Sequence, residues 1–160
     1  MLKIGVLVLM CALVTSCNKD SSSGNNNSQG VHGTAFNGTW HGSGTLSTGG
    51  STSPCSPMTL QIEETGTTFN IVTGSFACTT GNGATTVSVG PADFTISNNG
   101  LYLGSSLYGT ITSNTATATV SGSGATWSFT LNILSDGSLT YTDKTIYNGV
   151  TISSSGTFTK

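Results

Sequence analysis

The stretch TWSFTLNI, residues 126–133, has the clearest strand pattern in this sequence. Its apolar residues stand at alternate positions, with small polar residues between them: Trp127, Phe129, Leu131 and Ile133. Successive side chains of a β-strand point to opposite faces, so this alternation predicts a strand with one apolar and one polar face. No segment of residues 36–160 has a helical period, and we therefore predict an all-β domain.

The turn that follows decides how the next strand pairs with this one. A two-residue loop within Ser135-Asp136-Gly137 would place Tyr141 on the polar face. A three-residue loop, with its glycine in the left-handed conformation, instead pairs Leu131 with Tyr141. We therefore predict the three-residue loop, which keeps the apolar face continuous across both strands.

This register also brings one carboxylate, that of Asp143, onto the apolar face opposite Phe129 and on the same side as Tyr147. A carboxylate there is costly unless it is hydrogen-bonded or lies near an open end. We interpret Asp143 as a candidate ligand-binding group, with Trp127, Phe129 and Tyr141 as apolar walls of the same site. The alternatives are a strand end that is open to water, or an error in the register.

Turn signals divide the domain into about eight or nine strands joined mostly by short turns. The expected ranges are 36–47, 58–65, 68–78, 85–97 with a bulge at Gly90-Pro91, 101–112, 115–121, 125–134, 138–147 and 150–159. The turn at Ser113-Asn114 pairs Leu107 with Val120 on the apolar face. Such an antiparallel up-and-down meander closes into a small β-barrel when its last strand meets its first, and we favour that fold over a β-sandwich.

The first residues resemble an export signal. Residues 4–14 form an unbroken apolar run of 11, which fits a secretory signal and is shorter than the roughly 20 residues of a membrane-spanning helix. The stretch Val14-Thr15-Ser16-Cys17 resembles the lipobox of bacterial lipoproteins. The resemblance implies that residues 1–16 are a signal peptide and that Cys17 carries a diacylglycerol, with the new amino terminus acylated, for example by palmitate. An ordinary secretory signal with a chance cysteine is the alternative.

A polar segment follows the cysteine. Residues 18–30 are mostly Ser, Asn and Gly and have nothing apolar to bury, which predicts a flexible tether over residues 17–35. The tether would hold one folded domain, residues 36–160, off a membrane surface. Because Asn18 stands where an Asp is associated with inner-membrane retention, the resemblance implies the outer membrane of a bacterial cell envelope.

Two cysteines remain in the exported domain, which predicts one disulfide between Cys55 and Cys78. A two-residue turn at Gly66-Thr67 supports this pairing, because its register places Ile62 opposite Ile71 and the two cysteines opposite each other. Since prolines stand close to Cys55 on both sides, we expect the bridge to join a strand to an incoming loop.

The charge balance excludes one class of partner. Charged residues make up 6% of the chain, arginine is absent, and from Cys17 onward three lysines stand against six acidic residues, a net charge of −3. Nucleic-acid binding needs clustered Lys and Arg, so we expect no nucleic-acid partner.

The stretch Gly38-Thr39-Trp40 resembles the G-x-W on the first strand of lipocalins, and Asn37 to Trp40 is similar to the opening of avidins. Either resemblance implies a barrel with a small-molecule pocket at its mouth. Lipocalins place a late basic residue against this Trp, and here Lys144 or Lys160 could take that place. The alternative is that Trp40 closes the bottom of the barrel as part of the core.

No pattern of catalytic residues is present. His41 has the opposite parity to Trp40 and should point outward, and the carboxylates of Glu63 and Glu64 should face opposite sides of a strand. No group of residues has the spacing of a metal site, so we expect no enzyme activity, metal or cofactor.

Two functions remain open. The leading hypothesis is a non-catalytic, lipid-anchored envelope protein that binds a small apolar or amphiphilic ligand in a hollow barrel. The alternative is a structural or protein-interaction module of the outer membrane surface, which predicts a filled barrel.

Overall fold

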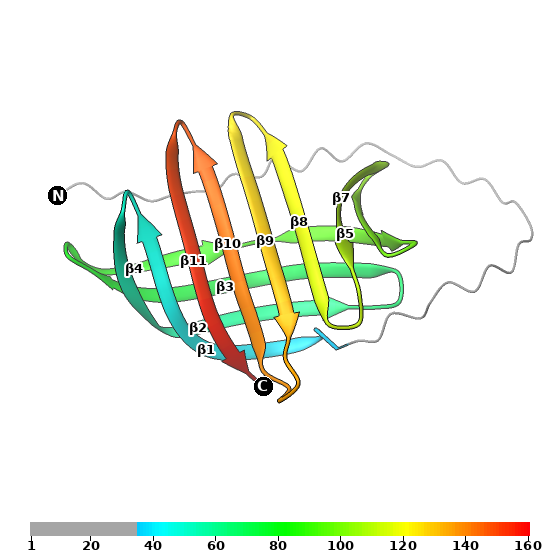
Figure 1. Ribbon diagram of the computed structural model, residues 1–160, viewed down its shortest axis with the longest axis horizontal. Helices are drawn as coiled ribbons and strands as arrows, with labels where there is room; N and C mark the ends of the chain where they lie inside the picture. The colour runs from blue at the N-terminus through cyan, green and yellow to red at the C-terminus, as the bar shows by residue number, and fades with distance from the viewer. Residues whose placement is uncertain (1–34) are drawn as a thin grey trace, which may run out of the picture.

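Residues 35–160 are described by the structure, a computed structural model, and they form one antiparallel sheet of eleven strands (Figure 1). The all-β, antiparallel prediction is therefore confirmed. The predicted signal peptide, the lipid-bearing Cys17 and most of the predicted tether lie outside the described residues. The strands are β1 (Gly38–Thr48), β2 (Ser51–Glu64), β3 (Thr68–Thr80), β4 (Gly83–Val89), β5 (Ala92–Ser97), β6 (Gly100–Leu103), β7 (Ser106–Ile111), β8 (Thr115–Gly122), β9 (Ala125–Ile133), β10 (Leu139–Tyr147) and β11 (Val150–Thr159).

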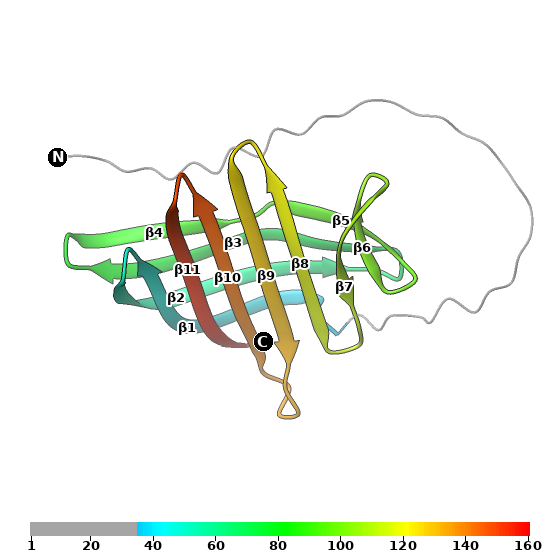
Figure 2. The same cartoon turned by 45° about the horizontal axis from the view of Figure 1, so that its top comes forward.

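The strand pairings close a ring. The last strand, β11, pairs with the first, β1, and β2 pairs with both β1 and β3. From β3 the ring continues through β5, β6, β7, β8, β9 and β10 back to β11, while β4 lies outside it and pairs with β3. In Figures 1 and 2 the strands β8 to β11 form one layer that crosses the layer of β2, β3, β4 and β5 at a steep angle, an orthogonal packing.

Two predicted strands are each divided, which accounts for the higher strand count. The range 85–97 is interrupted at Gly90-Pro91, where we expected a bulge, and becomes β4 and β5. Proline cannot donate a ladder hydrogen bond, so regular pairing stops there. The range 101–112 turns at Gly104, which has a φ of 61°, and becomes β6 and β7.

The predicted pairing of Leu107 with Val120 is wrong for the same reason. The turn at Gly104 folds β7 back along β6, so Leu107 pairs with Tyr102 and its side chain is 59% exposed. The pairing of β7 with β8 ends at Gly109.

The register predicted for β9 and β10 is confirmed, with Leu131 opposite Tyr141 and Phe129 opposite Asp143. The predicted pairs of Ile62 with Ile71 and of Cys55 with Cys78 are also present, although the pairing of β2 with β3 shifts register twice between them. Across the turn at Ser113-Asn114, Ile111 pairs with Ala116. Gly137 has a φ of 82°, the left-handed conformation that the three-residue loop requires.

The predicted disulfide is present between Cys55 and Cys78, with an S–S distance of 1.95 Å. Cys55 lies within β2 rather than in an incoming loop, so that part of the prediction is wrong. The irregularity expected from the nearby prolines takes the form of a register shift between Cys55 and Met58.

Aromatic side chains fill the interior of the ring. The core contains all six phenylalanines of the chain, together with Trp40 and Tyr141. The rings pack against one another: Phe69 stacks on Phe129 at 6.2 Å between centroids, and Phe76 contacts Tyr141 at 5.7 Å. Aromatic side chains bury large apolar areas, so this interior is a packed core.

Candidate functional site

The structure brings the four predicted ligand-binding residues together, but only two of them reach the surface. Phe129 and Tyr141 are buried in the core, with exposed fractions of 2% and 0%. Trp127 and Asp143 are half-buried at the end of that core. The ring of Trp127 lies 5.0 Å from that of Phe129, so the indole continues the aromatic core toward the surface.

Asp143 is held by the strand next to its own. Its Oδ1 accepts a hydrogen bond from the backbone N–H of Ser154 at 3.2 Å and a second, short one from the Ser154 hydroxyl. Burial raises the pKa of Asp143, while the bonds from Ser154 and one from the Trp127 side chain act in the opposite direction. No lysine or histidine of residues 35–160 acts on this pKa, so the carboxylate has hydrogen-bond donors but no cationic neighbour.

Tyr141 stands two residues before Asp143 on β10, on the same face of the strand, and its hydroxyl is buried. It has no hydrogen-bond partner within the described part of the chain. Burial raises the pKa of Tyr141 well above its ordinary value, and the negative charge of Asp143 raises it further. The Tyr141 phenol therefore stays protonated, and it is the carboxylate of Asp143 that favours a hydrogen-bond donor or a cation at this end of the core.

Beyond Asp143, the inner face of β8–β11 is apolar and incompletely covered. A row of paired residues crosses it: Val120, Trp127, Thr145 and Ile152. All four are half-buried rather than buried. In both views β8–β11 extend past the layer of β4 and β5 (Figure 2), and each of the four residues stands two residues from that end of its strand. We call these four residues, with Asp143 and Ser154, the open end.

Tyr147, which we predicted on the same face as Asp143, is not part of the open end. Its side chain is 54% exposed at the tip of the β10–β11 hairpin, beyond the part of the sheet that packs on the core.

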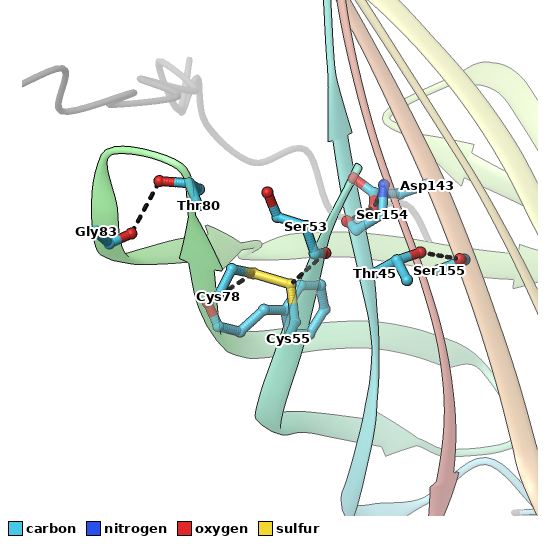
Figure 3. The surroundings of a disulfide bond; sticks show 10 residues. Thr45, Ser53, Cys55, Cys78, Thr80, Gly83, Asp143, Ser154 and Ser155 are labelled. Atoms are coloured by element: carbon cyan, nitrogen blue, oxygen red, sulfur yellow. Dashed lines mark hydrogen bonds between the residues drawn. A yellow bond between two sulfur atoms is a disulfide. The ribbon is translucent and has the colours of Figure 1, made fainter. Parts of the chain in front are cut away.

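The disulfide ties two other strands together beside this site. Figure 3 draws Asp143 and Ser154 in the surroundings of the bond between Cys55 and Cys78. Ser154 also pairs across the sheet with Leu46 of β1, which in turn pairs with Ser53 of β2. The carboxylate of Asp143 is therefore linked through neighbouring strand pairs to the part of β2 that the disulfide joins to β3.

The opposite end of the ring is closed by Trp40. Its indole N–H donates to the carbonyl of Phe36 at 2.8 Å, and its side chain is 2% exposed. Of the two lysines that the sequence offered, Lys160 lies over the ring, with Nζ 4.5 Å from its centroid. Lys160 also donates to the carbonyl of Ala35 at 3.3 Å.

The residues tested for catalysis stand apart from one another. His41 and Glu63 are exposed, whereas Glu64 is buried and its Oε2 accepts the backbone N–H of Phe36 at 3.1 Å. Among residues 35–160, no group of three or more His, Cys, Asp and Glu side chains could hold a metal ion. The same residues contain no helix with the length and apolar character to cross a membrane.

Sequence reasoning missed Ser154, which partners Asp143, and Ile152, which extends the apolar row. Their alternation with Phe158 on β11 could have placed them on the inner face. We predicted that Glu63 and Glu64 face opposite sides of a strand without assigning the inner side, although the parity of Glu64 with Leu60 and Ile62 indicates its burial.

Comparison with known proteins adds no family. No model of a known protein family matches this sequence, and no curated protein matches it with significant similarity.

Proposed function

We propose that this protein is a non-catalytic, lipid-anchored module of the bacterial cell envelope, at the outer membrane, that acts by binding a protein partner. The lipobox-like residues 14–17 support the anchor, and their identity rests on sequence alone. We class the ring of strands as a small, flattened β-barrel, because its first and last strands pair and only short stretches of edge remain.

The filled interior is the observation that carries this proposal. A small molecule bound in the ring would have to displace buried aromatic side chains such as Phe69, Phe76 and Phe129. Replacing one buried Phe by Ala costs roughly 3–5 kcal/mol in folded cores, and displacing such a side chain from the core would lose the same packing. Binding is therefore expected at the outside of the sheet, as for a protein-interaction module.

A small apolar or amphiphilic ligand is the second candidate, now at the open end rather than inside the ring. The half-buried indole of Trp127 beside the carboxylate of Asp143 favours it. An apolar chain could lie on Val120 and Ile152 while a polar head donates a hydrogen bond to Asp143.

Metabolic labelling with palmitate tests the anchor. In the full chain expressed in bacterial cells, Cys17→Ala should abolish label incorporation and release the protein from the membrane pellet. The matched control is Cys11→Ala, which changes a cysteine within the predicted signal and should leave both readouts unchanged. Labelling of Cys17→Ala at the wild-type level would overturn the anchor.

Native mass spectrometry of the same full chain, released gently from membranes, separates the two binding candidates. A small co-purifying mass that is lost in Trp127→Ala would favour the small ligand over the protein partner. A bare protein that cross-links to another protein in membranes would favour the interaction module.

A further inference from the structure

The strand β4, with the sequence GATTVSV, has one unpaired edge. Its residues from Gly83 to Val89 pair with β3, and no other strand of residues 35–160 pairs with it. An unpaired edge presents a row of backbone N–H and C=O groups to any extended chain that can reach it. An extended segment is therefore the kind of partner that this edge can bind through backbone hydrogen bonds.

This edge lacks the usual protection against pairing. Natural edge strands carry charged side chains, proline or bulges, and the seven residues of β4 contain none of these. Residues 51–54 of β2, which pair with β1 alone, make a useful contrast, because Pro54 stands there. The edge at β4 has no such proline.

The free edge of β4 faces the open end. In Figures 1 and 2, β3 runs along one side of β4, and on its other side β8–β11 continue past it. The apolar row Val120, Trp127, Thr145 and Ile152 lies on this overhanging part of the sheet. Val87 of β4 is also only partly buried against the core. The layer that contains β4 therefore stops short of the ends of β8–β11, as if a strand were missing along its free edge.

We propose that an extended segment of a partner protein adds to β4 as this missing strand, and that every second side chain of the segment packs on the apolar row. This inference rests on the proposed interaction function and names the class of partner. Backbone hydrogen bonds to β4 would supply affinity, and the row would select apolar side chains at alternate positions.

Asp143 adds a charge preference. Its carboxylate is desolvated, accepts bonds from Ser154, and has no cationic neighbour among the described residues. A Lys or Arg of the added strand could reach it beside the apolar row, because Asp143 stands two residues from Thr145 on β10, and this would pair a charge that the protein leaves uncompensated. The partner segment is therefore uncharged or basic, with alternating apolar residues.

Two other occupants fit the geometry less well. A second folded copy that paired its own β4 antiparallel would be related by a two-fold axis perpendicular to the sheet. Its overhanging strands would then enter the space already filled by β8–β11 of the first copy. Residues 18–34 of the chain itself carry one apolar side chain, that of Val31, which is too few to fill alternate positions along the row.

Photo-cross-linking in native membranes tests the position. The full chain would carry p-benzoylphenylalanine in place of Thr86, which is exposed on β4, or in place of Thr142, which is exposed on the outer face of β10. Thr142 is the matched control, because both edges of β10 are paired. The expected result is a cross-link from Thr86 alone to one segment of another protein, and mass spectrometry would identify alternating apolar residues with a Lys or Arg in that segment.

A synthetic peptide of the cross-linked segment then tests strand addition in the purified full chain. Hydrogen exchange should slow at alternate amides of β4, because one edge of a strand offers every second N–H. Asp143→Asn should weaken peptide binding about tenfold, while Asp93→Asn, at an exposed carboxylate on β5, should leave binding unchanged.

Several outcomes would overturn the proposal. Cross-linking from Thr142 but not Thr86 would keep the interaction module and reject the β4 edge. Cross-links from Thr86 to a second copy, or to residues 18–34, would reject the partner class. No protein cross-link from either position would contradict the strand proposal and the proposed function together.

Discussion

At the scale of single residues, Asp143 is the group that departs most from a simple core. It occupies the apolar face opposite Phe129, as the register predicted. The carboxylate is tolerated because Ser154 donates two hydrogen bonds to it and because the open end leaves it partly in contact with water. Ser154 could not be assigned this role from sequence, because the pairing of β11 with β10 decides which hydroxyl faces the carboxylate.

The pH dependence of stability should reveal Asp143. Its pKa is raised above the ordinary value of 3.8 by burial, so the folded chain binds the proton more tightly than the unfolded chain. The contribution of Asp143 to the free energy of unfolding is then largest below that ordinary value and is lost as the pH rises through the raised pKa. The free energy of unfolding of the wild type minus that of Asp143→Asn, both measured by urea denaturation, should decrease as the pH increases.

Asp136 supplies a control of opposite sign. Hydrogen bonds from the Ser138 side chain and backbone N–H lower its pKa, so its contribution to stability is lost as the pH falls. The free energy of unfolding of the wild type minus that of Asp136→Asn should therefore increase with pH. A difference for Asp143→Asn that also increases with pH would contradict the assignment of a raised pKa.

At the scale of elements, the bends in β1 and β2 let these strands belong to both layers. The pairing of β1 with β2 shifts register between Gly42 and Gly44, and that of β2 with β3 shifts between Cys55 and Met58. An extra residue in one strand bends it and increases its local twist. A glycine also explains why one predicted strand is divided in two. Gly104 adopts the left-handed conformation, which glycine accepts readily, and the chain turns there instead of continuing as a strand.

Gly44 tests how closely β1 and β11 approach. A Cβ at this position would overlap the carbonyl oxygen of Ser155 and the Cα of Gly156, both of them backbone atoms that cannot move aside cheaply. Gly44→Ala should lower the free energy of unfolding by at least about 2 kcal/mol, as overpacking does elsewhere. The measurement is the midpoint of urea denaturation.

Gly122 is the matched control for that substitution. It also lies in a strand, at the end of β8, and a Cβ there would meet no atom within 4 Å. Gly122→Ala should change stability by less than about 0.5 kcal/mol. Equal effects of the two substitutions would show that the approach of β1 to β11 is not tight.

At the scale of the whole molecule, the ring closes through two junctions of the β1–β2 hairpin, which pairs with β11 through β1 and with β3 through β2. The disulfide between Cys55 and Cys78 reinforces the second junction across a sequence separation of 23 residues. The aromatic core spans both layers, so opening either junction would expose it to water.

Removal of the disulfide should destabilise the whole domain. For a closed loop of this length the loss of chain entropy in the unfolded state corresponds to about 3 kcal/mol. The double variant Cys55→Ala with Cys78→Ala should show this loss in urea denaturation. Addition of a reductant should destabilise the wild type and leave the variant unchanged, whereas equal sensitivity of the two would contradict the prediction.

The sequence by itself determined the strand class, most of the turns and much of the register. Alternation in residues 126–133, a left-handed glycine at Gly137 and the spacing of Cys55 from Cys78 are local signals, because the pleat of a strand and the geometry of a turn depend on neighbouring residues. The filling of the ring, the pairing of Ser154 with Asp143, Lys160 over Trp40 and the free edge of β4 were decided by tertiary structure. These features depend on how the two layers cross and how far each strand extends. They join residues that are far apart in the sequence, and the packing of the whole core decides which of those residues meet.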